Sequence, residues 1–243
     1  MTMLRVAPAI FEAFPEARIG VVAFQGAQND RDPPELGTLL DHESAEAVRR
    51  LGATPVAEHP RVACWREAYR RFGAKPKDHP SSIENLLRRV AKSGPPRRIH
   101  PLVDLYNAVS LQHVVPVGGE DLDAVSGDVA LRFAGENEPA VRLLGEPPER
   151  ARPPKAGEVI YADEIGALCR RWNWKEADRT KLTERTTRGF LVVEALPPVG
   201  RAELDAALSD LAALVTEYCG GTVRTGVMDR ENPSFGLDSP PSP

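Results

Sequence analysis

The sequence predicts an α/β (α+β) fold: a single compact domain with a central mixed sheet flanked by helices. Its 243 residues are 42% hydrophobic and 27% charged, which suffices for a core without disulfides or metals. Apolar residues in the first half recur mainly at helical spacing. After Gly118 and Gly119 the pattern changes to short apolar runs typical of strands.

The first half begins with a strand and continues with helices. The run IGVVAF within residues 18–24 is typical of a buried strand. Ser81 and Glu84 form an S-x-x-E capping signature, and Gly52 and Gly73 are suited to end helices. Helical spacing of apolar residues predicts four helices, at residues 35–51, 62–72, 83–90 and 102–111.

The second half is expected to be rich in strands. Short apolar or alternating runs predict strands at residues 129–133, 141–144, 159–161 and 189–194, and leucine spacing predicts a last helix at 204–218. We expect residues 1–17 to be an N-terminal extension and residues 18–222 to form the domain. The remaining residues, 223–243, are predicted to be a Pro/Ser-rich, disordered tail.

Composition excludes several classes of protein. The longest uncharged apolar runs are far shorter than the roughly 18 residues of a bilayer span, so no membrane contact is expected. The first residues lack the pattern of a secretory signal, which favours a cytoplasmic location. Cys64, Cys169 and Cys219 are far apart, and the five histidines show no HxxxH spacing, so no metal site is expected.

The charge is unevenly distributed. The formal net charge is only −4, yet residues 49–98 contain thirteen Lys and Arg against four acids. This segment could face a polyanion. The alternative is that its arginines form solvated helix faces without a partner.

One polar and aromatic segment stands out as a candidate binding loop. The chain has no nucleophile elbow, phosphate-cradling glycine loop or dinucleotide fingerprint. Residues 169–186, CRRWNWKEADRTKLTERT, instead combine two tryptophans with an asparagine, a glutamate and several cations. Trp172 and Trp174 could stack on a base or form a pocket wall, or they could simply anchor the loop.

Three segments in fixed order, residues 100–123, 127–132 and 158–197, resemble the B3/B4 editing domain of the phenylalanyl-tRNA synthetase β subunit. Residues 103–109, VDLYNAV, match the helix that this family writes as VVDxTNYV. Gly127, Asp128 and Val129 match its next strand, and VIYAD at 159–163 and TTRGFLVVE at 186–194 match two later strands. The resemblance covers residues 80–197.

The resemblance implies an α/β domain whose cavity accepts the wrongly charged aminoacyl end of a tRNA and hydrolyses the ester without metal or organic cofactor. Asn107 matches the helix asparagine of the family and Glu176 its editing glutamate, so these two are the expected catalytic residues. The expected substrate-binding residues are Tyr106, Gly118, Gly119, Trp172, Asn173 and Trp174. Those expected to bind tRNA are Arg88, Arg89, Arg97, Arg98, Arg170, Arg171 and Lys175.

The chain departs from the family at two places in the pocket. The synthetases have a Met-His-Ala-Phe-Asp run where this chain has VGGED at 117–121, so the pocket histidine is replaced by Gly118. The glycine-rich turn before the glutamate is replaced by RRWNW at 170–174. The pocket is therefore expected to have another shape and another specificity.

We expect a trans-acting aminoacyl-tRNA deacylase, with substrates that range from an aromatic amino acid to a threonine-like analogue. Loss of the family's histidine supports an alternative, a non-catalytic module that binds tRNA or an amino acid. A third hypothesis is a protein that makes a transient contact with a synthetase through its apolar or basic helices.

Overall fold

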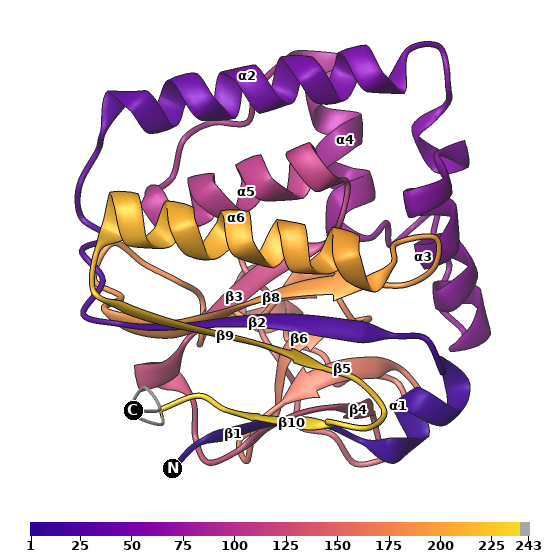
Figure 1. The fold of residues 1–243 in the computed structure, drawn as a ribbon. Helices are drawn as coiled ribbons and strands as arrows, with labels where there is room; N and C mark the ends of the chain where they lie inside the picture. Colours follow the sequence, from indigo (N-terminus) through magenta and orange to yellow (C-terminus); the bar gives the residue numbers. More distant parts are fainter. Residues whose placement is uncertain (239–243) are drawn as a thin grey trace.

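The structure, a computed structural model, describes residues 1–238 and confirms the α/β class. The strands are divided between two sheets, where one central sheet was expected. Figure 1 shows the sheets stacked face to face, with the long helices layered on the outer face of one of them.

The sheet that contacts the helices has four antiparallel strands. Its members are β2 (Arg18–Gln25), β3 (Val117–Asp121), β8 (Arg188–Ala195) and β9 (Thr222–Met228), in the order β3-β8-β2-β9. Strand β2 pairs with β8 on one side and β9 on the other, and it is buried along almost its whole length because both faces of the sheet are covered there.

The second sheet has six shorter strands and is mixed. It contains β1 (Met3–Val6), β4 (Val129–Phe133), β5 (Val159–Ala162), β6 (Ala167–Arg170), β7 (Lys175–Glu176) and β10 (Ser234–Gly236). Their order is β10-β1-β4-β5-β6-β7. Only the β1–β4 pair among these described strands is parallel, and the other pairs are antiparallel.

Six α-helices occur in residues 1–238. They are α1 (Pro8–Ala13), α2 (Pro34–Leu51), α3 (Pro60–Arg71), α4 (Ser82–Ser93), α5 (Pro101–His113) and α6 (Arg201–Cys219). Short 3-10 helices span Val56–Glu58, Leu122–Ala124 and Pro148–Arg150. Helices α5 and α6 lie on the four-stranded sheet and α2 packs on α5, as the upper half of Figure 1 shows. None of these helices is long and apolar enough to span a bilayer.

The alternation of β2 divides the core into two parts. Ile19 and Val21 point into the space between the two sheets, whereas Val22 and Phe24 pack with the apolar side chains of α5 and α6. This is the period of two expected of a strand buried on both faces. The four-stranded sheet is thus the central layer of the molecule.

The predicted strand β2 and the helices α2 to α6 are confirmed, with ends shifted by a few residues. The strands predicted at 129–133, 159–161 and 189–194 correspond to β4, β5 and β8. The strand predicted at 141–144 is wrong: this segment forms only the isolated bridges Val141–Arg152 and Leu143–Ala177.

The expected domain limits need correction at both ends. Residues 3–6, assigned to an extension, form β1 between β4 and β10, so they are part of the six-stranded sheet. Residues 222–228, almost all assigned to a disordered tail, form β9. This strand pairs with the backbone N–H and C=O groups on the edge of β2 that β8 leaves free. Ser234–Gly236 form β10. Residues 239–243 of the expected tail lie outside the described part of the chain.

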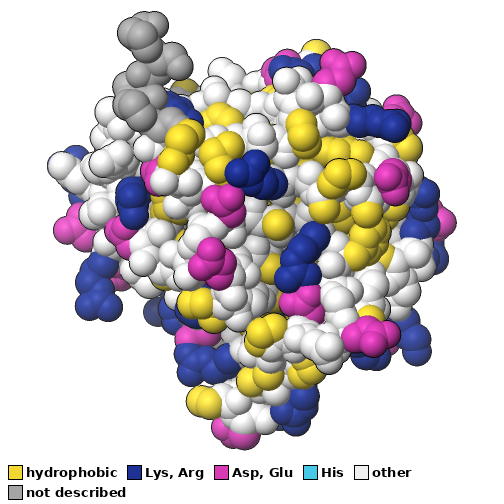
Figure 2. Space-filling view, turned by 90° about the horizontal axis from the view of Figure 1, so that it is seen from below, with side chains coloured by type: hydrophobic (Ala, Val, Ile, Leu, Met, Phe, Trp, Pro, Cys, Tyr) yellow, Lys and Arg dark blue, Asp and Glu magenta, His cyan; other side chains and the backbone are white. Residues whose placement is uncertain are grey.

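The face opposite the long helices carries no concentrated positive charge. Figure 2 shows Lys and Arg side chains there interspersed with Asp and Glu and with small apolar areas. The arginine-rich helices α3 and α4 belong to the other half of the molecule (Figure 1).

Candidate functional site

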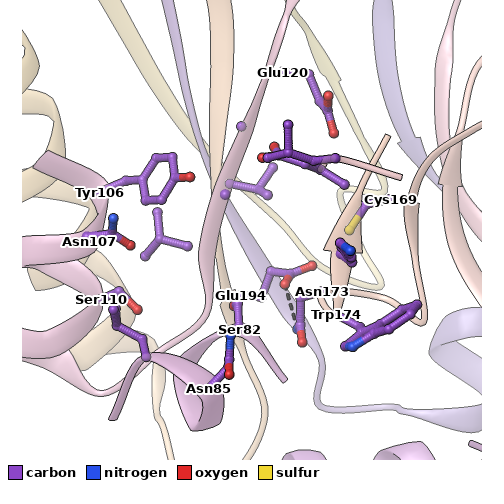
Figure 3. Close-up of a pocket in the computed structure, with 18 of the residues that line it drawn as sticks. Ser82, Asn85, Tyr106, Asn107, Ser110, Glu120, Cys169, Asn173, Trp174 and Glu194 are labelled. Carbon is purple, nitrogen blue, oxygen red and sulfur yellow. Dashed lines mark hydrogen bonds between the residues drawn. The ribbon is translucent and has the colours of Figure 1, made fainter. Parts of the chain in front are cut away.

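A cavity of about 350 Å³ opens between the two sheets and helices α4 and α5. It brings together all eight residues expected to be catalytic or to bind substrate: Tyr106, Asn107, Gly118, Gly119, Trp172, Asn173, Trp174 and Glu176. Figure 3 shows Tyr106 and Asn107 on one side and Asn173 and Trp174 on the other. The volume lies at the lower end of the roughly 300–1,000 Å³ found for small-molecule sites.

Helix α5 supplies an unengaged amide to this cavity. Pro101 begins the helix and its apolar residues face the core, which leaves Tyr106 and Asn107 half-buried on the side toward the cavity. Within residues 1–238 the side chain of Asn107 makes no hydrogen bond and no ion pair. Both its carbonyl oxygen and its NH₂ group are therefore available to a ligand.

The two glycines on β3 have different roles. A Cβ atom at Gly119 would lie 2.6 Å from the carbonyl oxygen of Phe190, so Gly119 permits close packing of β3 against β8. A Cβ atom at Gly118 would meet nothing within 4 Å. Gly118 therefore leaves open the space that a side chain would otherwise fill.

The turn between β6 and β7 forms another wall in an unusual backbone conformation. Arg171 and Trp172 have φ values of 49° and 65°, a left-handed region that costs free energy for residues other than glycine. The indole of Trp172 compensates by burial: its ring lies 4.9 Å from that of Phe14 and 5.1 Å from that of Trp65. Trp172 is therefore a buried anchor whose edge reaches the cavity.

Arg170 and Arg171, two of the residues expected to bind tRNA, are engaged within the protein. Arg170 donates from Nε and Nη2 to the two carboxylate oxygens of Glu158, at 2.9 and 2.8 Å. The side chains of Arg170, Arg171 and Glu158 are all almost fully buried. The backbone N–H of Arg171 also donates to Glu158, and its guanidinium lies over the ring of Trp174. These two arginines hold the turn, because a buried guanidinium requires a carboxylate partner.

The other expected tRNA contacts differ in availability. Arg89 and Arg97 are exposed and line the mouth of the cavity. Arg88 is exposed but pairs with Glu84, and Lys175 at the cavity pairs with Glu146 at 3.1 Å. Arg98 pairs with Asp32 and Asp104 and does not line the cavity.

A hydrogen-bonded chain fixes the side of the cavity formed by both sheets. Tyr69 donates to Oδ1 of Asn173 at 2.8 Å, and Nδ2 of Asn173 donates to Glu194 at 2.7 Å. Tyr161 on β5 donates to the second oxygen of Glu194 at 2.6 Å. Asn173 is thereby oriented by its neighbours, and its role is to hold Glu194 in position (Figure 3).

Three glutamates from different strands line the cavity: Glu120 on β3, Glu176 on β7 and Glu194 on β8. Burial raises the pKa of Glu194 to about 7, although its hydrogen bonds from Tyr161 and Asn173 oppose the shift. Burial likewise raises the pKa of Glu176 to about 7. Burial and the nearby Glu176 raise the pKa of Glu120 well above its usual range.

Glu120 and Glu194 are the residues that the sequence analysis missed. An acid within a strand is more typical of a solvent-facing position, and neither residue belongs to a motif that marks it as part of a site. The signal for Glu120 was its place two residues after Gly118, which puts both on the same side of β3. No group of three or more His, Cys, Asp or Glu in residues 1–238 is arranged to hold a metal ion.

Comparisons with known proteins identify a family and a similar solved structure. The model of the B3/4 domain matches residues 64–220, more than half of the chain. The chain is similar to an N-terminal fragment of the phenylalanyl-tRNA synthetase β subunit from Pyrococcus horikoshii, with 14% identity and a TM-score of 0.46 over 91% of this chain. It spans 50% of the length of that fragment. No curated protein matches the chain.

Proposed function

The chain belongs to the B3/4 domain family, and from that premise we propose that it is a trans-acting aminoacyl-tRNA deacylase. The observation that carries the proposal is the cavity between the sheets, lined by Asn107 and by the carboxyl group of Glu176. An aminoacyl ester is already activated toward water. A site that excludes bulk solvent and positions the ester and one water therefore suffices for hydrolysis.

Glu176 receives the α-ammonium group of the aminoacyl ester in this proposal. Its side chain is partly buried and makes no hydrogen bond within the described residues, so the carboxylate is free for a cation. A bound ammonium ion favours the ionised carboxylate and offsets the cost of burying that charge. The pKa of Glu176, about 7, makes binding weaker in acid, where the carboxyl group is protonated.

Asn107 orients the attacked carbonyl group or the attacking water. Its free amide lies on the opposite side of the cavity from the β6–β7 turn (Figure 3). An amide can both donate to a developing oxyanion and accept from water, which is the chemistry this step requires. Arg89 and Arg97 at the mouth are suited to contact phosphates of the tRNA end.

The test is release of amino acids from a panel of correctly and wrongly charged tRNAs by the wild type and by Glu176→Gln and Asn107→Ala. We expect hydrolysis of one aminoacyl group by the wild type and a loss of about 100-fold or more in each variant. Glu136→Gln, at an exposed position away from the cavity, is the matched control and should retain full activity. Hydrolysis that is unchanged in Glu176→Gln would remove this residue from the mechanism.

The open space at Gly118 supports a second candidate, a module that binds the aminoacyl end without hydrolysing it. Where the resembling synthetases have a histidine, this chain places no side chain. The same panel distinguishes the two functions. Salt-sensitive binding of charged tRNA without release of any amino acid would favour the binding module.

A further inference from the structure

Glu120 is a buried carboxyl group that the proposed reaction does not use. It is 6% exposed, and its Oε2 accepts no hydrogen bond from any residue in 1–238. An unpaired buried carboxylate is costly, and native proteins rarely retain one without a ligand or a role. Glu120 lines the same cavity as Glu176 and Glu194, so whatever fills the cavity meets its carboxyl group.

The basic side chains around this part of the cavity are already engaged. Lys181 pairs with Asp178 at 2.6 Å and Arg179 with Asp163 at 2.8 Å, and Lys175 pairs with Glu146. The partner acid of each of these cations is thus a residue other than Glu120, Glu176 and Glu194. Arg89 and Arg97 are exposed at the mouth, so the inner part of the cavity, lined by Glu120, Glu176 and Glu194, carries an excess of carboxyl groups.

The carboxyl groups are spread along the cavity wall. Glu120 is opposite Phe190 in the pairing of β3 with β8, and Glu194 follows four residues later on β8. At about 3.3 Å per residue, the two glutamates are separated by about 13 Å along the strand direction. Figure 3 shows Glu120 and Glu194 at different heights, with the cavity residues between them. Glu120 and Glu194 are thus separate acceptors on the wall, whereas Glu176 is close enough to Glu120 to raise its pKa.

We propose that the cavity selects an aminoacyl group that carries a second cation on its side chain, and that Glu120 accepts a hydrogen bond from that cation. The proposal rests on the proposed function, in which Glu176 receives the α-ammonium group. Glu194, held by Tyr161 and Asn173, adds negative potential along the same wall. Lysine and ornithine have this chemistry, whereas norleucine has the shape of lysine without the terminal amine.

The first experiment measures binding, which does not depend on hydrolysis. Lysinamide, ornithinamide, norleucinamide and tyrosinamide are titrated into the wild type, Glu120→Gln and the control Glu136→Gln at pH 7.5. The wild type and the control should prefer lysinamide or ornithinamide over norleucinamide by about 10- to 100-fold, the range for hydrogen bonds to charged groups. Glu120→Gln should keep its affinity for norleucinamide and reduce that preference to about twofold or less.

Thermal denaturation shows that the variant is folded. Glu120 makes no ion pair within residues 1–238, so its replacement by the neutral isostere glutamine should not lower the melting temperature. Equal affinity for lysinamide and norleucinamide, preference for tyrosinamide, or a preference that survives in Glu120→Gln would each overturn the proposal.

The second experiment compares hydrolysis of lysyl and norleucyl esters on one tRNA. A binding preference for the second amine without hydrolysis of either ester would refute the deacylase function and support the selectivity. Hydrolysis of both esters at equal rates would support the deacylase and refute the selectivity.

Discussion

Replacement of Glu158 by glutamine removes the carboxylate that lies between Arg170 and Arg171 while keeping the size of the side chain. The side chains of Glu158 and Arg170 are only 5% and 7% exposed, so solvent screens the loss of charge very little. Breaking a buried ion pair by removing one partner costs about 3–5 kcal/mol. Because glutamine can still accept one hydrogen bond, we expect a value near the lower end, about 3 kcal/mol.

For a chain of this length, each kcal/mol corresponds to about 2–4 °C, so the melting temperature of Glu158→Gln should fall by about 6–12 °C. The assay is thermal and urea denaturation at pH 7. Asp205→Asn is the control, because its pair with Arg201 is half-exposed and is expected to contribute less than about 0.5 kcal/mol. A Glu158→Gln protein that melts within about 2 °C of this control would refute the assignment of Glu158 as the support of the β6–β7 turn.

The pH dependence of stability provides a second test of the ion pair between Glu158 and Arg170. Burial alone would raise the pKa of Glu158, but hydrogen bonds and charge from Arg170, with Arg171, hold it below its usual value. A carboxyl group with a lowered pKa in the folded state contributes stability above its unfolded pKa, near 4.5, and loses it as the pH falls through the folded value. The difference in stability between wild type and Glu158→Gln should therefore shrink in acid.

Three further predictions concern the fold and the cavity. A chain truncated after Gly221 loses β9 and β10 and should be insoluble, because β2 then presents a free edge; soluble, cooperatively melting protein would show that the domain does not require these two strands. Gly118→Leu should abolish ligand binding with little change in melting temperature, since a Cβ there meets no atom within 4 Å; undiminished binding would show that ligands do not use this space. For Glu194, whose folded pKa of about 7 exceeds its unfolded pKa, the stabilising effect is complete below about pH 4.5 and is lost as the pH rises through 7. The advantage of the wild type over Glu194→Gln in urea unfolding should thus decrease by on the order of 3 kcal/mol between pH 4.5 and 8, and a constant difference would count against burial as the cause.

The sequence predicted the helices whose apolar residues recur at helical spacing and the strands that contain a continuous or alternating apolar run. The apolar stripe of α4 and its Ser81 cap indicated a helix, and the apolar run of β2 indicated a strand. Strand β3 was missed because two glycines and two acids give it no apolar run, and β9 was missed because Thr and Arg occupy its partly exposed positions. Both are defined by pairing with strands distant in the sequence, which local patterns do not encode.

The site was predicted in part for a similar reason. The order of motifs correctly grouped Tyr106, Asn107 and Glu176 around one cavity, since the resemblance carries information about tertiary structure. The burial of Arg170 depends on Glu158, which lies twelve residues earlier and immediately before the neighbouring strand β5, and no local feature of the RRWNW segment reveals that partner. Glu120 and Glu194 became candidates only when their strands were seen to face the same space.

The pairing of β1 with β10 also determines when the molecule can finish folding. Met3 pairs with Gly236, and β2 at the centre of its sheet pairs with β8 and β9 near the other end of the chain. Contacts between residues so distant in sequence make folding slow, because long loops must close before any pairing stabilises them. During synthesis, β2 therefore has no partner strand until β8 has left the ribosome, and β1 does not pair with β10 until residue 236 has done so. Until β8 has emerged the apolar strand β2 is unpaired, and this is the period in which the nascent chain is most exposed to aggregation.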